Sequence, residues 1–256
     1  MRYLSAVVLS VCAVSAQAST LPGVGTFTGN AGFGTPNGDV SASPVGGSYV
    51  YISTYNSVSQ TGLGLGSETN GTMLTTNAFD AEVGDELSYY FNFITSDGAG
   101  FSDYAYVQLQ KLGEDPFLIF TARTRPEGDI VPGFGLPDIA DGVTLVPSSS
   151  EIIPLETNWS FLGDDSGTCF AAGCGQTDWI QSLYTIEEAG SYALTFGVVN
   201  WSDTAYDSGL AVTGVTVGDV VIIGPETPVP IPLPAAGWTL LGALFGLGAL
   251  RRKRTA

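Results

Sequence analysis

The sequence predicts an all-β protein, a single β-sandwich flanked by an apolar segment at each end. Apolar and polar residues alternate with a period of two in several runs, which places successive side chains on opposite faces of a strand. Glycine supplies 34 of the 256 residues, which favours turns and disfavours long helices. Between the two ends, no segment has the apolar periodicity of an amphipathic helix.

Two consecutive alternating runs give the clearest strands. In residues 87–94 one face carries Leu87 and Phe91, and after a turn at 97–100 the run 104–110 carries Val107 on its apolar face. The pair predicts an antiparallel hairpin, or two strands of a sandwich joined by a compact loop. Further strands are expected at 48–54, 72–79, 117–122, 143–146, 159–162, 179–186, 192–198 and 210–223.

Strand follows strand without an intervening helix, which indicates a sandwich of the jelly-roll type over residues 48–224. Residues 19–47 are rich in Gly, Ser, Thr, Asn and Pro and predict an irregular leader or an edge strand.

The N-terminal residues 1–18 have the pattern of a secretory signal peptide. Arg2 is followed by an apolar run and then by the small-residue sequence Ala16-Gln17-Ala18. Cleavage is expected between Ala18 and Ser19. A lipoprotein attached through Cys12 is the alternative, but Val11 precedes that cysteine where a small residue is required.

The C-terminal residues combine a proline-rich stalk at 225–234 with an apolar run and a basic end at 235–256. Residues 235–250 would span about 24 Å as a helix. The hydrocarbon core of a bilayer is roughly 30 Å thick, so this is a short transmembrane helix. Cations directly after the apolar run keep the C-terminus on the cytoplasmic side, and the domain lies outside.

This tail resembles the PEP-CTERM-like sorting tails of Gram-negative bacteria, in the variant with a Val-Pro-Leu-Pro-Ala signature. The matching residues are Val229, Pro230, Leu233, Pro234 and Ala235, with Ile231-Pro232 inserted. The resemblance implies that an exosortase-type membrane enzyme processes the tail and delivers the protein to the cell surface or extracellular matrix. A plain single-pass anchor is the alternative.

Charge excludes one class of partner. Once Arg2 and the four basic tail residues are set aside, three cations and 25 acids remain, a net charge of −22. Nucleic acid is excluded as a partner because phosphate binding needs a basic surface. An acidic surface instead suits solubility and the binding of divalent cations.

The chain contains no histidine, which removes imidazole bases, Ser-His and Cys-His pairs and His-ligated metals. A glycosidase that uses two carboxylates stays open as an alternative, although no spacing singles out a pair. We therefore expect a protein that is not an enzyme.

The only cysteines after signal cleavage are Cys169 and Cys174. In an oxidising compartment such a pair predicts a disulfide. A redox-active couple is the alternative, but the spacing is not Cys-x-x-Cys.

Two acidic loops predict a cation site. Calcium takes six to eight oxygen ligands from flexible loops. If the strand pairing brings both loops to one edge, they would supply such ligands; otherwise the same residues cap turns. The candidate ligands are Asp97, Asp103, Asn200, Asp203 and Asp207.

A mixture of aromatic and amide side chains predicts a glycan-binding face, because aromatic planes stack on sugars and amides bond to their hydroxyls. The same residues are also ordinary sheet surface. The candidates are Tyr90, Asn92, Tyr104, Tyr106 and Gln108. Trp159, Trp179 and Trp201 are expected to pack in the core or at its rim.

Residues 184–200, 203–217 and 102–109 resemble strands of the carbohydrate-binding-module-like jelly rolls of exported bacterial proteins. Many of those domains have an acidic or amide residue where this chain has Thr213, so no metal ligand is assigned there. Taken together with the acidic loops and the sorting tail, this resemblance predicts a cell-surface or matrix protein that binds polysaccharide with calcium support. A glycan-processing enzyme and a purely structural envelope protein are the alternatives.

Overall fold

The computed structural model describes residues 18–58, 62–154 and 157–224. The expected signal peptide up to residue 17, the stalk and the sorting tail lie outside these ranges. Within them, no helix is long and apolar enough to cross a membrane.

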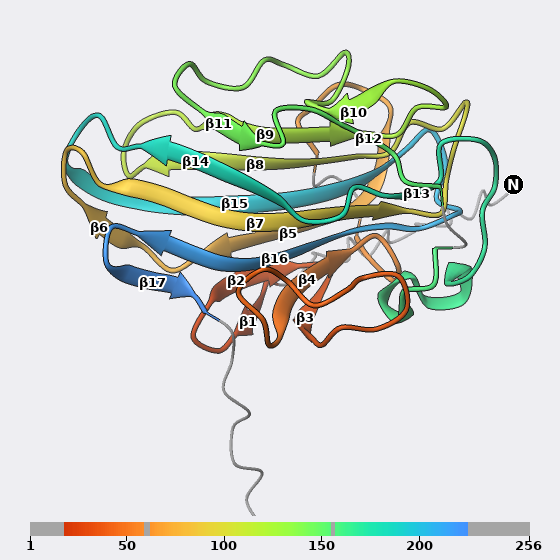
Figure 1. The fold of residues 1–256 in the computed structure, drawn as a ribbon, viewed down its shortest axis with the longest axis horizontal. Coiled ribbons are helices and arrows are strands. Elements are labelled where there is room, and N and C mark those ends of the chain that lie inside the picture. Colours follow the sequence, from red (N-terminus) through yellow and green to blue (C-terminus); the bar gives the residue numbers. More distant parts are fainter. Residues whose placement is uncertain (1–17, 59–61, 155–156, 225–256) are drawn as a thin grey trace, which may run out of the picture. The chain divides into compact units, whose positions relative to one another are not determined.

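Two antiparallel sheets pack face to face as a sandwich (Figure 1). The seven-stranded sheet contains β1 (Ser19–Leu21), β2 (Gly25–Thr28), β5 (Glu68–Thr76), β6 (Phe79–Ala81), β8 (Tyr104–Lys111), β9 (Phe117–Arg123) and β15 (Gly190–Trp201). The eight-stranded sheet contains β3 (Asn30–Gly34), β4 (Tyr49–Ser53), β7 (Glu86–Thr95), β11 (Thr144–Val146), β13 (Gly175–Gln176), β14 (Ile180–Thr185), β16 (Ser208–Val217) and β17 (Val220–Ile223). A small ribbon pairs β10 (Asp129–Val131) with β12 (Ser150–Glu151).

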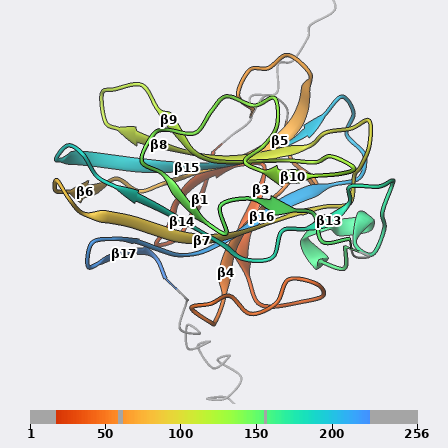
Figure 2. The same ribbon diagram turned by 45° about the horizontal axis from the view of Figure 1, so that its top comes forward.

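The chain crosses repeatedly between the two sheets, so neighbours within a sheet are distant in sequence. Four neighbouring strands of one sheet have the order β4-β16-β7-β14, and four neighbouring strands of the other have the order β5-β15-β8-β9. Figure 2 shows the two layers after a rotation of the view. The runs at 87–94 and 104–110 are therefore strands of opposite sheets joined by a loop and not a hairpin.

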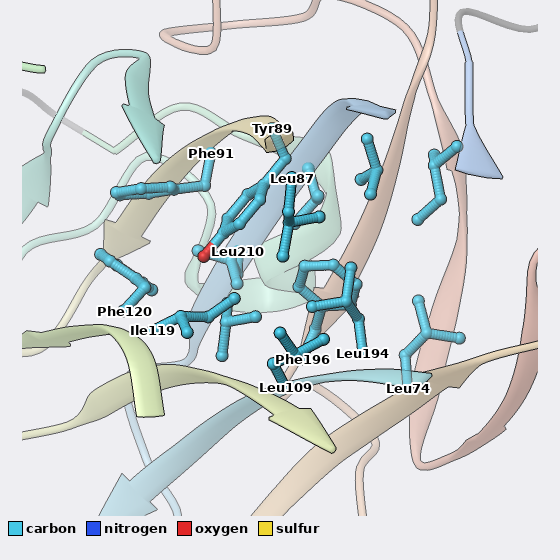
Figure 3. Packing of buried hydrophobic residues seen from close by; sticks show 14 of the residues in the cluster. Leu74, Leu87, Tyr89, Phe91, Leu109, Ile119, Phe120, Leu194, Phe196 and Leu210 are labelled. Carbon is cyan, nitrogen blue, oxygen red and sulfur yellow. The ribbon is translucent and has the colours of Figure 1, made fainter. Parts of the chain in front are cut away.

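The core between the sheets consists of the faces that the alternation predicts. Leu87, Tyr89, Phe91 and Phe93 of β7 are fully buried there. They face residues of β8, β9 and β15, and the rings of Phe91 and Phe120 lie 3.7 Å apart between centroids (Figure 3).

The eight-stranded sheet is also covered on part of its outer face. On the eight-stranded sheet, a short 3-10 helix, η1 (Ser160–Asp165), packs with Tyr49 and Trp159, whose indole Nε1 donates a 2.8 Å hydrogen bond to the Tyr49 hydroxyl. Gly209 of β16 makes this packing possible, because a Cβ there would lie 2.3 Å from the Trp159 ring. Trp159 is fully buried, as expected of a packing residue.

Some predicted elements differ from those observed. The strand expected at 159–162 is wrong: this segment leads into η1, where Gly163 has a φ of 58°. The run 72–79 is divided between β5 and β6, and the run 210–223 is a β16–β17 hairpin that turns at Gly218. Residues 19–47, expected as a leader or an edge strand, contain the three strands β1, β2 and β3.

Candidate cation site

The five predicted cation ligands lie at one end of the sandwich, the end near β13 and η1 in Figure 1. Antiparallel pairing explains this placement. Ser208, the first residue of β16, lies opposite Thr95, the last residue of β7, and Tyr104 at the start of β8 lies opposite Val199 near the end of β15. The loops after β7 and β15 therefore meet. They carry Asp97, Asp103, Asp203 and Asp207, and Asn200 lies just before the second loop, near the end of β15.

Asp103 is fully buried and joins the two sheets. Its Oδ1 accepts a 2.8 Å hydrogen bond from the backbone amide of Trp201, and its Oδ2 accepts a 2.6 Å bond from the Ser208 hydroxyl. Burial raises the pKa of this carboxyl well above its usual range, and the charges of Asp97 and Asp203 add to the shift. Because both oxygens are engaged, we interpret Asp103 mainly as a structural anchor.

Asp207 connects the site to β4 and to η1. The Thr54 hydroxyl donates a 2.7 Å hydrogen bond to its Oδ1, and its own backbone amide donates a 2.9 Å bond to Asp165 Oδ2. Burial and the nearby charges of Asp165 and Asp164 raise the pKa of Asp207 to about 6. Sequence reasoning missed Asp165, which η1 brings into the cluster.

Asp97 and Asn200 carry the feature that points most directly to a ligand. Asp97 Oδ1 accepts a 2.7 Å hydrogen bond from the Gly98 amide, but Oδ2 is buried and has no hydrogen-bond partner among the described residues. Asn200 is fully buried, and neither its Oδ1 nor its Nδ2 has a hydrogen-bond partner of normal geometry among the described residues, although the amide lies near enough to Asp207 to lower the pKa of that carboxyl. Burial, together with the charges of Asp203 and Asp165, raises the pKa of Asp97 to about 7.

The atoms available to coordinate a metal ion here are carboxylate, amide and main-chain oxygens. Across the three described ranges, no group of three or more Asp, Glu or Cys side chains is close enough to form a ready-made metal centre. An ion here would use Asp97, Asn200 and Asp203 together with main-chain oxygens and water. Calcium accepts this mixture and variable geometry, whereas zinc prefers Cys and His ligands and magnesium requires a near-ideal octahedron.

The predicted disulfide between Cys169 and Cys174 is present, and its loop braces the segment that holds Asp97. The Phe170 amide donates to the Ser96 carbonyl and the Ala99 amide donates to the Ala172 carbonyl, both at 2.9 Å. These two bonds flank Asp97. The contact needs glycine at 98, because a Cβ there would lie 2.6 Å from the Ala171 carbonyl oxygen.

The five residues expected to form one glycan face do not share a face. Tyr90 and Asn92 lie on the outer side of the eight-stranded sheet, whereas Tyr104, Tyr106 and Gln108 lie on the outer side of the seven-stranded sheet. The expectation of one platform is corrected because β7 and β8 belong to opposite sheets.

Three of the five residues are also buried. Asn92 Nδ2 donates a 2.6 Å hydrogen bond to Gln176, and the Tyr104 hydroxyl donates a 3.0 Å bond to Glu68 Oε1. Tyr106 packs over Gly197, where a Cβ would lie 2.2 Å from its ring. Only Tyr90 and Gln108 are partly exposed.

The terminal processing residues are described in part. Ala18 and Ser19 are exposed, and Ser19 is the first residue of β1. The sorting motif at 229–235 lies outside the described residues. No protein-family model matches this chain, and a search of curated proteins finds no match.

Proposed function

We propose that the chain is an exported cell-surface or extracellular-matrix protein that is not an enzyme and that binds polysaccharide with the support of a calcium ion. Its sorting tail is processed by an exosortase-type enzyme, and the membrane holds the tail until then. The β-sandwich is the part that acts outside the cell.

The observation that carries the calcium proposal is the buried Asp97 Oδ2, a carboxylate oxygen without a hydrogen-bond donor among the described residues; the buried Asn200 Oδ1 is a second oxygen without one, on an amide that lies near Asp207. A buried acceptor left unsatisfied costs about 1–3 kcal/mol, and more when it is charged. Here the acceptors stand beside Asp103, Asp203 and further carboxylates, with no cation paired to them in the described chain. A dication would satisfy both oxygens and neutralise the repulsion.

The jelly-roll assignment is supported by strand order. Eight strands, β4, β5, β7, β8, β9, β14, β15 and β16, give the two orders β4-β16-β7-β14 and β5-β15-β8-β9. Each order places the earliest strand beside a late one, which is how two Greek keys fold into facing four-stranded sheets.

Export is supported by the disulfide and by the net charge of the domain. The Cys169–Cys174 disulfide is typical of proteins that mature in oxidising compartments. The net charge of −22 on the segment between the termini suits a protein that stays soluble outside the cell and attracts divalent cations.

We expect a panel of polysaccharides to retain the purified domain in calcium and to retain it less in a chelator, with no release of reducing ends. Affinity electrophoresis and a reducing-sugar assay on the same panel measure the two quantities. Release of reducing ends would favour the carboxylate-pair glycosidase instead. If no polysaccharide retains the domain, the result would favour a purely structural envelope protein.

Intact mass spectrometry of the protein recovered from cells tests export and processing. We expect the mass of a polypeptide that begins at Ser19 and lacks the segment after the proline motif. The disulfide should make this mass smaller by two hydrogens than that of the reduced polypeptide. Full-length protein with free thiols would contradict the proposal. A trimmed N-terminus with an intact tail would instead support the plain membrane anchor.

A further inference from the structure

The described part of the chain contains three cationic side chains, and they differ in how their charge is balanced. Lys111 forms ion pairs with Glu188 at 2.5 Å and Glu114 at 3.2 Å. Arg123 and Arg125 form no ion pair with any described residue. Two arginines without an ion pair are unusual in a chain with 25 acidic residues, because a carboxylate partner would be easy to supply.

The two arginines form one stack with two aromatic rings, which we call the arginine stack. The Arg123 guanidinium carbon lies 4.4 Å from the Trp201 ring centroid and 5.3 Å from that of Phe134, and Arg125 lies 5.1 Å from Phe134. The order is Trp201, Arg123, Phe134, Arg125. Cation–π contacts hold guanidinium groups over aromatic faces without neutralising their charge.

Main-chain carbonyls fix the positions of both guanidinium groups. Arg123 Nε donates a 3.1 Å hydrogen bond to the Ser102 carbonyl, and Arg125 Nη1 donates a 3.3 Å bond to the Asp129 carbonyl. Burial lowers the pKa of Arg123, but a guanidinium stays charged in proteins. Arg123 is mostly buried, whereas Arg125 is partly exposed and Phe134 is 39% exposed.

Two glycines lie against the guanidinium groups. A Cβ at Gly135 would lie 3.4 Å from Arg123 Nη1, and a Cβ at Gly128 would lie 3.0 Å from Arg125 Nη2. Both glycines have positive φ, 64° and 80°, so the turns that carry them also favour residues without a side chain. A ligand can therefore reach the arginine stack from the side of Arg125 and Phe134, whereas Arg123 itself is only 8% exposed.

The arginine stack adjoins the cation site. The backbone amide of Trp201 donates to Asp103, and the Trp201 ring contacts Arg123. A cation bound among the neighbouring carboxylates would weaken the negative field that the domain presents to an anion.

We propose that the arginine stack binds the carboxylate of an acidic sugar, so that the ligand is a uronate-containing polysaccharide. This inference rests on the proposed polysaccharide binding and names its ligand class. A guanidinium fork matches a carboxylate with two parallel hydrogen bonds, and the exposed Phe134 ring offers an apolar plane to a sugar. Glu127 and Asp129 are exposed and lie close to Arg125 in sequence. Their carboxylates repel an anionic ligand, so only a ligand whose carboxylate contacts the guanidinium groups directly should bind.

The test compares Gly135→Asp with Gly135→Asn. Asp and Asn tolerate positive φ similarly, so the two variants carry matched backbone strain. Only Gly135→Asp places a carboxylate beside Arg123 Nη1, where it competes with the ligand. We expect binding of oligogalacturonate in calcium to weaken about tenfold or more in Gly135→Asp and to change about threefold or less in Gly135→Asn.

Isothermal titration calorimetry measures each Kd at about 0.15 M salt. The Debye length is then about 8 Å, so long-range charge effects are screened and the Kd reports mainly short-range contacts. Arg125→Gln should weaken binding as well, and thermal melts of each variant confirm folding. The fully methyl-esterified oligomer, which has no free carboxylate, should bind far more weakly than the acid. A sulfated glycan should also bind more weakly, since sulfate lacks the planar carboxylate geometry.

Several outcomes would overturn the inference. They are equal binding of the ester and the acid, equal binding of the sulfated glycan, and unchanged binding in Gly135→Asp. If neutral polysaccharides bind and these differences are absent, only the ligand class is wrong. If no polysaccharide binds at all, the proposed function itself is wrong.

Discussion

Replacing Asp97 by Asn should make the calcium-free protein more heat-stable at pH 8 and abolish its stabilisation by calcium. The unpartnered Oδ2 of Asp97 is buried near Asp103 and Asp203, so its ionised form is repelled in the folded state. Asn keeps an oxygen for the Gly98 amide and removes the charge. We expect the calcium Kd to rise about 100-fold, in line with the central role of carboxylate charge in calcium affinity.

The pH dependence of the wild-type protein follows from the same raised pKa values. Asp97 has a pKa of about 7 and Asp207 of about 6 in the folded protein, against about 3.9 for an unfolded Asp. Between roughly pH 4 and pH 7 the folded state therefore binds more protons than the unfolded state. Stability without calcium should be full below this window and should fall as pH rises through it.

Calcium should reverse this trend, because it binds the ionised carboxylates and displaces their protons. Melts with chelator and with calcium at pH 5 and pH 8 measure both effects. Asp80→Asn, which removes an exposed carboxylate on β6, is the matched control and should keep the calcium response. A wild-type melting temperature that changes neither with pH nor with calcium would argue against a cation site.

Replacing Phe91 by Ala should destabilise the domain by about 3–5 kcal/mol, the usual result of removing a buried ring. Phe91 is fully buried, and its ring contacts Phe120 of the opposite sheet (Figure 3). In a domain of this size each kcal/mol lowers the melting temperature by about 2–4 °C, so we expect a fall of about 10 °C.

Val221→Ala provides the control for the Phe91 variant. Val221 is 62% exposed on β17, so its truncation should change stability by about 0.5 kcal/mol or less. Chemical denaturation of both variants under the same conditions gives the two free energies. Equal stabilities would mean that Phe91 does not join the two sheets.

The sequence predicts the core faces well because alternation is a local property. Leu87 and Phe91 on one run and Val107 on the other are buried between the sheets. The sheet to which each run belongs is decided by pairing with strands about 80 to 130 residues away, such as β8 with β15 and β7 with β16, and alternation carries no such information. For this reason the single glycan face was wrong although the outward-facing residues were identified correctly.

The candidate cation site could be anticipated further than the arginine stack. Loops that follow β7 and precede β16 meet whenever those strands are antiparallel neighbours, so Asp97 and Asp207 were predictable as a group. Asp165 arrives through η1, where the aromatic sequence Trp159–Leu162 resembles a strand. Arg123 and Trp201 meet only because β9 and β15 both flank β8, which no spacing in the sequence reveals.

The pairing of β4 with β16 also constrains how the molecule folds. Ile52 lies opposite Leu210, and Thr54 bonds to Asp207, 153 residues further along the chain. The eight-stranded sheet therefore cannot close until residues 208–217 have emerged, whether from the ribosome or from a secretion channel. Proteins dominated by such distant contacts fold in milliseconds to seconds. If the chain is exported, as we propose, this delay is useful, because the polypeptide can cross the membrane unfolded and fold after it has crossed.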